Sequence, residues 1–183
     1  MGCLLLIQTE MLNLEVLNMQ RVVLDTNIYG LIVVDEDRTK VRNKIEKEKI
    51  VVVYGLQLIR KELRDTPKNI KVEGANLRNY LLSIYDEITK NHTLKFTDEA
   101  ENLAESYFNI YKELGGYASR VEIMKDFVIV GSASLNYLDI VVSNDNKTML
   151  SDKSIKAYRI VNSLKNIRMP RFMSYEEFKK ELK

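Results

Sequence analysis

Four acidic residues stand where carboxylates can carry out metal-dependent chemistry. Asp25 ends the apolar run of VVLDTN, and Asp145 follows a similar run in IVVSND. Glu62 lies in the charged segment LIRKELRD, and Asp126 lies in the unusually apolar segment MKDFVIVGSAS. Carboxylates about 4–5 Å apart repel by roughly 3–4 kcal/mol per pair at an effective dielectric constant near 20. Three or four of them in one pocket must therefore take up protons or bind cations.

The composition narrows the cation to one that prefers oxygen. Cys3 is the single cysteine and His92 the single histidine, so neither a thiolate cage nor a multi-histidine zinc site can form. Oxygen ligands favour Mg²⁺ or Mn²⁺. A water molecule on such a metal can attack a phosphodiester while the metal stabilises charge on the leaving oxygen. The four acids thus predict a metal site for phosphodiester hydrolysis.

The elements that must position these acids alternate between strand and helix. Short β-branched runs predict buried strands over residues 21–25, 50–54 and 139–143, and an edge strand is expected over 167–173. Helical patterns cover residues 38–49, 56–65, 76–91, 98–114, 119–135 and 152–165, and a last helix follows Ser174. Strands separated by helices pair in parallel within a layered α/β sheet, whose crevice lies at the carboxyl ends of the strands.

In order and spacing, VVLDTN, the acid of LIRKELRD, KDFVIVGSAS and IVVSND resemble the pattern of the PIN-domain nucleases. The resemblance covers roughly residues 21–173. It implies an α/β fold, a three-layer α/β/α sandwich with a mostly parallel central sheet. It also implies a Mg²⁺- or Mn²⁺-dependent endoribonuclease, either a toxin of a toxin–antitoxin pair or an RNA-processing enzyme. The partners that it implies are RNA, a small antitoxin protein and a second copy of the chain in a homodimer.

Carried over residue by residue, the resemblance assigns catalysis and metal binding to Asp25, Glu62, Asp126 and Asp145. The residues that match the polar positions around these acids are Thr26, Asn27 and Ser143, the last standing where the family usually has Thr. The family often carries a further acid two residues after the last one, where this chain has Lys147. This departure and the long helical stretch of residues 76–114 bear on the toxin assignment more than on the metal site.

Each acid also has a simpler explanation. Asp25 can cap the helix that follows it, and Asp145 can be a turn residue. Glu62 can be a solvated helix acid, with Asp65 as a competitor for its role. Asp126 is the hardest to explain structurally, because a carboxylate on an apolar helix is costly without a partner.

Neighbouring polar residues carry weaker signals. Glu122 lies one turn before Asp126, but a capping box with Ser119 accounts for it. Basic side chains near the acids are candidates for holding phosphate, and equally for a solvated surface: Arg60, Lys61, Arg64 and Lys147.

The overall composition is that of one ordinary globular domain. The chain has 183 residues, 45% of them hydrophobic and 30% charged, with a net charge of +2 that permits a polyanion partner without indicating one. No segment is long and apolar enough for a membrane span or a signal peptide, and the single cysteine suits a reducing cytosol, so we expect a cytoplasmic protein. Residues 1–20 are interpreted as an extension, one that includes an upstream start at Met1, and residues 21–183 as the nuclease domain.

Two other functions compete with nuclease activity. A catalytically inactive RNA-binding or assembly module of the same fold would keep the pocket without cutting, although the full set of acids argues against it. A phosphatase or phosphotransfer receiver also places acids at strand ends, but a receiver needs an acidic pair there and Asp25 follows only apolar residues.

Overall fold

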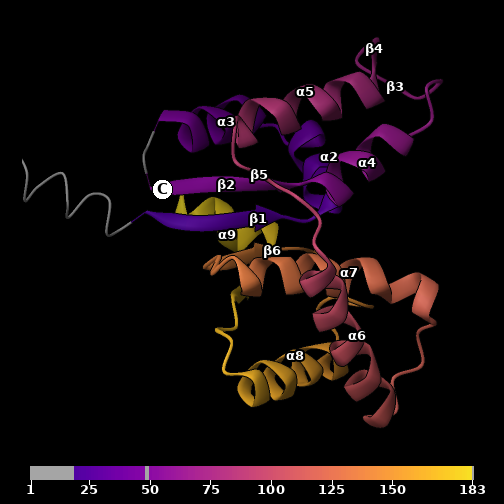
Figure 1. The fold of residues 1–183 in the computed structure, drawn as a ribbon. Helices are drawn as coiled ribbons and strands as arrows, with labels where there is room; N and C mark the ends of the chain where they lie inside the picture. The colour runs from indigo at the N-terminus through magenta and orange to yellow at the C-terminus, as the bar shows by residue number, and fades with distance from the viewer. Residues whose placement is uncertain (1–18, 48–49, 183) are drawn as a thin grey trace, which may run out of the picture.

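The computed structural model describes residues 19–47 and 50–182 and is built around a parallel sheet (Figure 1). The strands run in the order β5-β2-β1-β6-β7, and every neighbouring pair is parallel. Their bounds are β1 (Gln20–Leu24), β2 (Val51–Leu56), β5 (Thr93–Leu94), β6 (Ile140–Val142) and β7 (Arg171–Met173). The predicted parallel sheet is confirmed, with β7 at an edge as expected.

Eight helices surround this sheet within the described residues. They are α2 (Thr26–Val34), α3 (Arg38–Lys47), α4 (Gln57–Asp65), α5 (Leu77–Thr89), α6 (Asp98–Glu113), α7 (Arg120–Leu135), α8 (Asp152–Lys165) and α9 (Tyr175–Glu181). In Figure 1 the helices α2 to α5 gather beside β2, and α6 to α8 gather on the opposite side, next to β6. The chain is an α/β sandwich, and the predicted fold class is confirmed.

The predicted element bounds differ from the observed ones mainly at the ends. The proposed extension over residues 1–20 lies outside the described residues except for Met19 and Gln20, and Gln20 already opens β1. The short strand β5 was not expected, and neither was a hairpin of β3 (Lys71–Val72) and β4 (Ala75–Asn76). The predicted capping box of Ser119 with Glu122 is confirmed at the start of α7, and a second one, of Ser174 with Glu177, opens the last helix, α9.

The central strands are buried because helices cover the sheet. Val22, Val23 and Leu24 of β1 are fully buried, as are all three residues of β6. Such continuous apolar runs, without the alternation of a half-exposed strand, are typical of a parallel sheet between helices. Asp25 and Ser143 follow these two strands directly, so the sheet carries both to the same edge.

A close approach between β2 and α5 requires glycine. A Cβ atom on Gly55 would lie 2.2 Å from the hydroxyl oxygen of Tyr85. That hydroxyl donates to the carbonyl of Leu56 at 3.0 Å, at the end of β2. The contact fixes the point where β2 turns into α4, the helix that carries Glu62.

Helix α7 owes its position to aromatic packing on its buried face. The Phe127 ring makes edge-on contacts with Tyr107 and Tyr111 of α6 and with Tyr158 of α8. Tyr107 also donates to Asn162 of α8 at 2.6 Å. These contacts fix the position of α7, and so of Asp126, the residue before Phe127.

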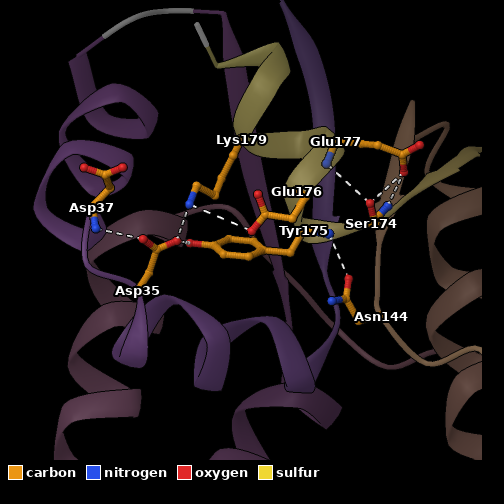
Figure 2. Close-up of polar contacts among 8 residues, drawn as sticks. All are labelled: Asp35, Asp37, Asn144, Ser174, Tyr175, Glu176, Glu177 and Lys179. Atoms are coloured by element: carbon orange, nitrogen blue, oxygen red, sulfur yellow. Dashed lines mark hydrogen bonds and ion pairs between the residues drawn. The ribbon is translucent and has the colours of Figure 1, made fainter.

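Helix α9 is fastened to the end of α2 by a cluster of polar contacts (Figure 2). Asp35, just after α2, accepts from the Lys179 ammonium at 2.7 Å and from the Tyr175 hydroxyl at 2.8 Å. The backbone N–H of Asp37 donates to the same carboxylate at 2.8 Å. We call Asp35, Asp37, Tyr175 and Lys179 the C-terminal latch.

The latch also borders the loop after β6. The Asn144 side chain accepts from the backbone N–H of Tyr175 at 2.8 Å, as Figure 2 shows, and the backbone N–H of Asn144 donates to the Asn27 side chain at 3.3 Å.

Within residues 19–47 and 50–182, none of the helices combines the length and the apolar character that a membrane span needs.

Candidate active site

Asp25 occupies the first position after β1, at the centre of the sheet edge. The residue is 5% exposed, and its carboxylate accepts from the Ser143 hydroxyl at 2.7 Å and from the backbone N–H of Thr26 at 2.7 Å. The Asn27 amide donates to the same carboxylate. The N–H of Thr26 makes Asp25 the cap of α2, so the simpler explanation holds as well. Capping occupies one carboxylate oxygen, and the other faces Ser143 and Asn27.

Asp145 lies two residues after Ser143, in the turn that follows β6. Its carboxylate accepts from the backbone N–H groups of Lys147 at 2.8 Å and Thr148 at 3.0 Å, so it does organise a turn. Its own N–H donates to the Ser143 hydroxyl at 3.0 Å. The Ser143 hydroxyl thus lies between the Asp25 carboxylate and the backbone of Asp145.

Asp126 projects from α7 toward the same turn. Its carboxylate accepts a hydrogen bond from the Thr148 hydroxyl, which also lies 2.6 Å from Asp145. One threonine therefore contacts two of the four acids, although those acids come from different elements.

Glu62, on α4, closes the set from the other side. It accepts from the Thr26 hydroxyl at 2.5 Å and from the Lys125 ammonium at 2.6 Å. Its side chain is 23% exposed, whereas Asp65 is exposed and borders the site only through its charge on Lys125. The structure thus brings Glu62 to the site in preference to its competitor.

The charges of the four acids act on one another, and we call Asp25, Glu62, Asp126 and Asp145 the acidic pocket. Burial raises the pKa of Asp126 to about 7, against the Thr148 hydrogen bond, and the charges of Asp25, Asp145 and Glu62 add to the rise. Burial likewise raises the pKa of Asp25 to about 6, opposed by the bonds from Ser143 and Thr26 and assisted by Glu62 and Asp145. Desolvation and like charges are the two causes that disfavour an ionised carboxylate.

Asp145 behaves differently within the same pocket. Burial alone would raise its pKa, but hydrogen bonds from Thr148 and Lys147 outweigh burial and lower it. The pocket therefore keeps one firmly ionised carboxylate beside two that hold protons more readily.

The carboxylates approach one another through intervening hydroxyls. In residues 19–47 and 50–182, no three acidic, histidine or cysteine side chains stand close enough to enclose an ion directly. Instead Thr26, Ser143 and Thr148 place a hydroxyl beside or between the acids. Mg²⁺ usually keeps several waters and takes only one or two carboxylates directly, so this spacing and the all-oxygen donors fit such an ion.

The predicted phosphate-binding residues lie on the elements that carry Glu62 and Asp145, and Arg60 differs from the others in having a partner. Arg60 is held by both carboxylate oxygens of Asp86, at 2.9 and 3.0 Å. Lys61 and Arg64 are exposed on α4, and Lys147 is exposed in the turn after β6.

Sequence reasoning missed two residues that contact the acids. Lys125 pairs with Glu62, and its place directly before Asp126 in the sequence was the available signal. Thr148 had no comparable signal, because a polar residue in a polar turn is ordinary. Glu122 caps α7 through the Ser119 N–H at 2.7 Å, as expected.

The sequence matches no protein-family model and no curated protein, but solved structures share its fold, and two of them are as follows. One is VapBC2 from Rickettsia felis bound to a DNA fragment from their promoter, with a TM-score of 0.54 and 12% identity, covering 85% of this chain and 98% of that chain. The other is FitAB bound to an IR36 DNA fragment, with a TM-score of 0.54 and 13% identity, covering 84% of this chain and 94% of that chain.

The chain has a PIN-like fold. The resemblance read from VVLDTN, KDFVIVGSAS and IVVSND is confirmed at this level. At 12% and 13% identity the two structures establish the fold of the PIN-like domain, and the roles of its acids rest on the residues of this chain.

Proposed function

We propose that this PIN-like domain is a divalent-metal-dependent endoribonuclease that hydrolyses RNA phosphodiester bonds. One observation carries the proposal: Asp25 and Asp126 are withdrawn from water beside further acids, and burial and like charge raise their pKa values to about 6 and about 7. A fold gains nothing in stability from such an arrangement. A bound cation relieves it.

The residues that would hold Mg²⁺ or Mn²⁺ are Asp25, Glu62, Asp126 and Asp145. The metal, when bound, activates a water molecule for attack and stabilises negative charge at the phosphate. Ser143 and Asn27 fix the rotation of the Asp25 carboxylate, and Thr26 does the same for Glu62. Geometry held by hydrogen bonds in this way keeps ligands oriented when no metal is present.

Electrostatics support a negatively charged substrate that arrives with the metal. Lys61 and Arg64 are exposed on α4, the helix of Glu62, and Lys147 is exposed in the turn of Asp145, so these side chains would supply positive charge for phosphates on either side of the cut. Such contacts position the strand without reading its sequence.

The partner proposal follows from the family resemblance. We include a small antitoxin protein and a homodimer in it, since VapBC2 and FitAB are two-component complexes in structures that also contain DNA. The catalytically inactive RNA-binding module stays as the second candidate, because the described acids do not converge directly on one point.

Paired variants test the nuclease proposal. Asp126→Asn and Asp25→Asn are expected to lower Mn²⁺-dependent cleavage of a fluorescent single-stranded RNA by at least about 100-fold, because each removes a charged ligand. Glu122→Gln is the matched control, one turn from Asp126 on α7 and able to cap the helix as Glu does. Its rate should stay close to that of the unaltered protein.

Two results distinguish the candidates. Cleavage that survives in both aspartate variants would exclude the four-acid site. If the unaltered protein binds RNA but shows neither cleavage nor Asp25-dependent Mn²⁺ binding in calorimetry, the inactive module is the correct function.

A further inference from the structure

Thr148 contacts two acids of the pocket with both its side chain and its backbone. Its hydroxyl is hydrogen-bonded to Asp126 and lies 2.6 Å from Asp145. Its N–H donates to the other oxygen of Asp145 at 3.0 Å. Asp126 belongs to α7 and Asp145 to the turn after β6, so Thr148 joins two elements at the site.

The position of Thr148 is set from behind by α8. The Ser154 hydroxyl donates to the Thr148 carbonyl at 2.6 Å, and the Tyr158 hydroxyl donates to the carbonyl of Met149 at 3.1 Å. Ser154 and Tyr158 are fully buried. The turn itself is closed by the N–H of Leu150, which donates to the Asp145 carbonyl at 2.8 Å. The hydroxyl is therefore presented to the acids by a rigid support.

A hydroxyl suits this place for a physical reason. It has one proton to donate and lone pairs to accept with, so it can stand between two acidic groups without cancelling their charge. A lysine or arginine there would form ion pairs and compete with a metal. A valine of the same shape would leave both carboxylates without that donor.

We propose that Thr148 is a positioning residue, whose hydroxyl sets the separation and orientation of Asp126 and Asp145 for one divalent cation. The inference rests on the proposed function and deepens it. Thr148 acts through the two acids and contacts no reacting atom itself. Groups that orient metal ligands typically change metal affinity by about 10–100-fold when removed.

The test compares Thr148→Val with Thr148→Ser by titrating Mn²⁺ into each protein in a calorimeter. Valine keeps the shape and loses the hydroxyl, so its affinity for Mn²⁺ should fall by about 10–100-fold. Serine keeps the hydroxyl and should bind within about threefold of the unaltered protein. Thr39→Val, at an exposed position on α3, controls for the substitution itself and should change nothing.

A kinetic readout separates positioning from a general loss of structure. Thr148→Val should lower kcat while KM for RNA stays within about twofold, since phosphate contacts elsewhere are kept. Its thermal unfolding without metal should remain cooperative. If the valine variant does not fold, Thr148→Ala removes the hydroxyl without placing a methyl group between the carboxylates.

The outcomes keep the two proposals apart. Equal Mn²⁺ affinity in Thr148→Val and the unaltered protein, with binding lost in Asp25→Asn, would overturn the positioning role and leave the nuclease site standing. Weak binding in Thr148→Ser to the same degree as in Thr148→Val would also overturn it, because the hydroxyl would then be irrelevant. Absence of Mn²⁺ binding in the unaltered protein would instead refute the proposed function.

Discussion

The C-terminal latch and the acidic pocket both withdraw carboxylates from water, yet their surroundings are opposite. Asp35 in the latch has an 8% exposed side chain and receives an ammonium, a phenol and a backbone N–H. Burial alone would raise its pKa, but the bonds from Lys179 and Tyr175 outweigh burial and lower it. Asp25 and Asp126 receive hydroxyl, amide and backbone donors, and their pKa values rise.

The difference distinguishes a structural acid from the acids of the proposed metal site. In the latch, Lys179 of α9 neutralises the Asp35 carboxylate, so the charge of Asp35 needs no further partner (Figure 2). In the part of the chain that the structure describes, neither Asp25 nor Asp126 forms an ion pair; Lys125 is directed to Glu62 instead. Buried acids without a cationic partner, near the carboxyl ends of the strands, are what the proposed metal site requires.

Breaking the latch should have the largest effect on stability. Asp35→Asn removes the charge that faces Lys179, and we expect the free energy of unfolding to fall by about 2 kcal/mol, in the range for hydrogen bonds to charged groups. Urea unfolding at pH 7 measures it. Glu176→Gln is the control, because Glu176 is 71% exposed and lies 3.9 Å from the same lysine. Equal stability of the two variants would contradict a structural role for the latch.

The matching change in the pocket should act in the opposite direction. Without metal, Asp126→Asn should raise the free energy of unfolding by about 1 kcal/mol at pH 7, since it removes a carboxylate whose charged form the fold disfavours. The pKa of Asp126 rises from 3.8 to about 7, so the folded state binds more protons than the unfolded state between these values. Stability of the metal-free protein should therefore decline across that window as pH rises.

Urea unfolding in EDTA at several pH values tests this sign. The contribution of Asp35 to stability has the opposite pH dependence, because its pKa is lowered from 3.8 in the folded state. The latch therefore stabilises the fold fully above pH 3.8 and less as the pH falls below that value. Asp126→Asn should reduce the loss of stability that occurs as pH rises above 4. Added Mg²⁺ should reduce the same loss in the unaltered protein. A variant less stable than the unaltered protein at every pH would show that the pocket is structural.

The smallest effect on stability is expected for Lys125, the lysine that pairs with Glu62. Lys125 has a 57% exposed side chain, so its pair with Glu62 is well solvated. Lys125→Gln should change the free energy of unfolding by less than about 0.5 kcal/mol, and added salt should reduce the difference further. A loss as large as that of Asp35→Asn would mean that Lys125 serves the pocket as Lys179 serves the latch.

Much of the fold could be read from the sequence because its signals are local. The apolar runs that end in Asp25 and precede Asp145 predicted two central strands to within a residue or two, and Ser119 with Glu122 marked the start of α7. The two-residue strand β5 escaped prediction, because its pairing with β2 depends on a neighbour nearly 40 residues away rather than on its own side chains.

For the candidate site, too, local signals could be read from the sequence and long-range contacts could not. The sequence predicted the four acids of the site and placed two of them after strands, since strand ends are visible as changes in local composition. Only the tertiary structure decided that Glu62 rather than Asp65 faces the pocket. It also decided that Thr148 joins Asp126 to Asp145. The nearby cation is Lys125, rather than an arginine or a histidine. Those choices depend on helix rotation and on contacts between distant segments, which packing of the whole chain sets and no single segment encodes.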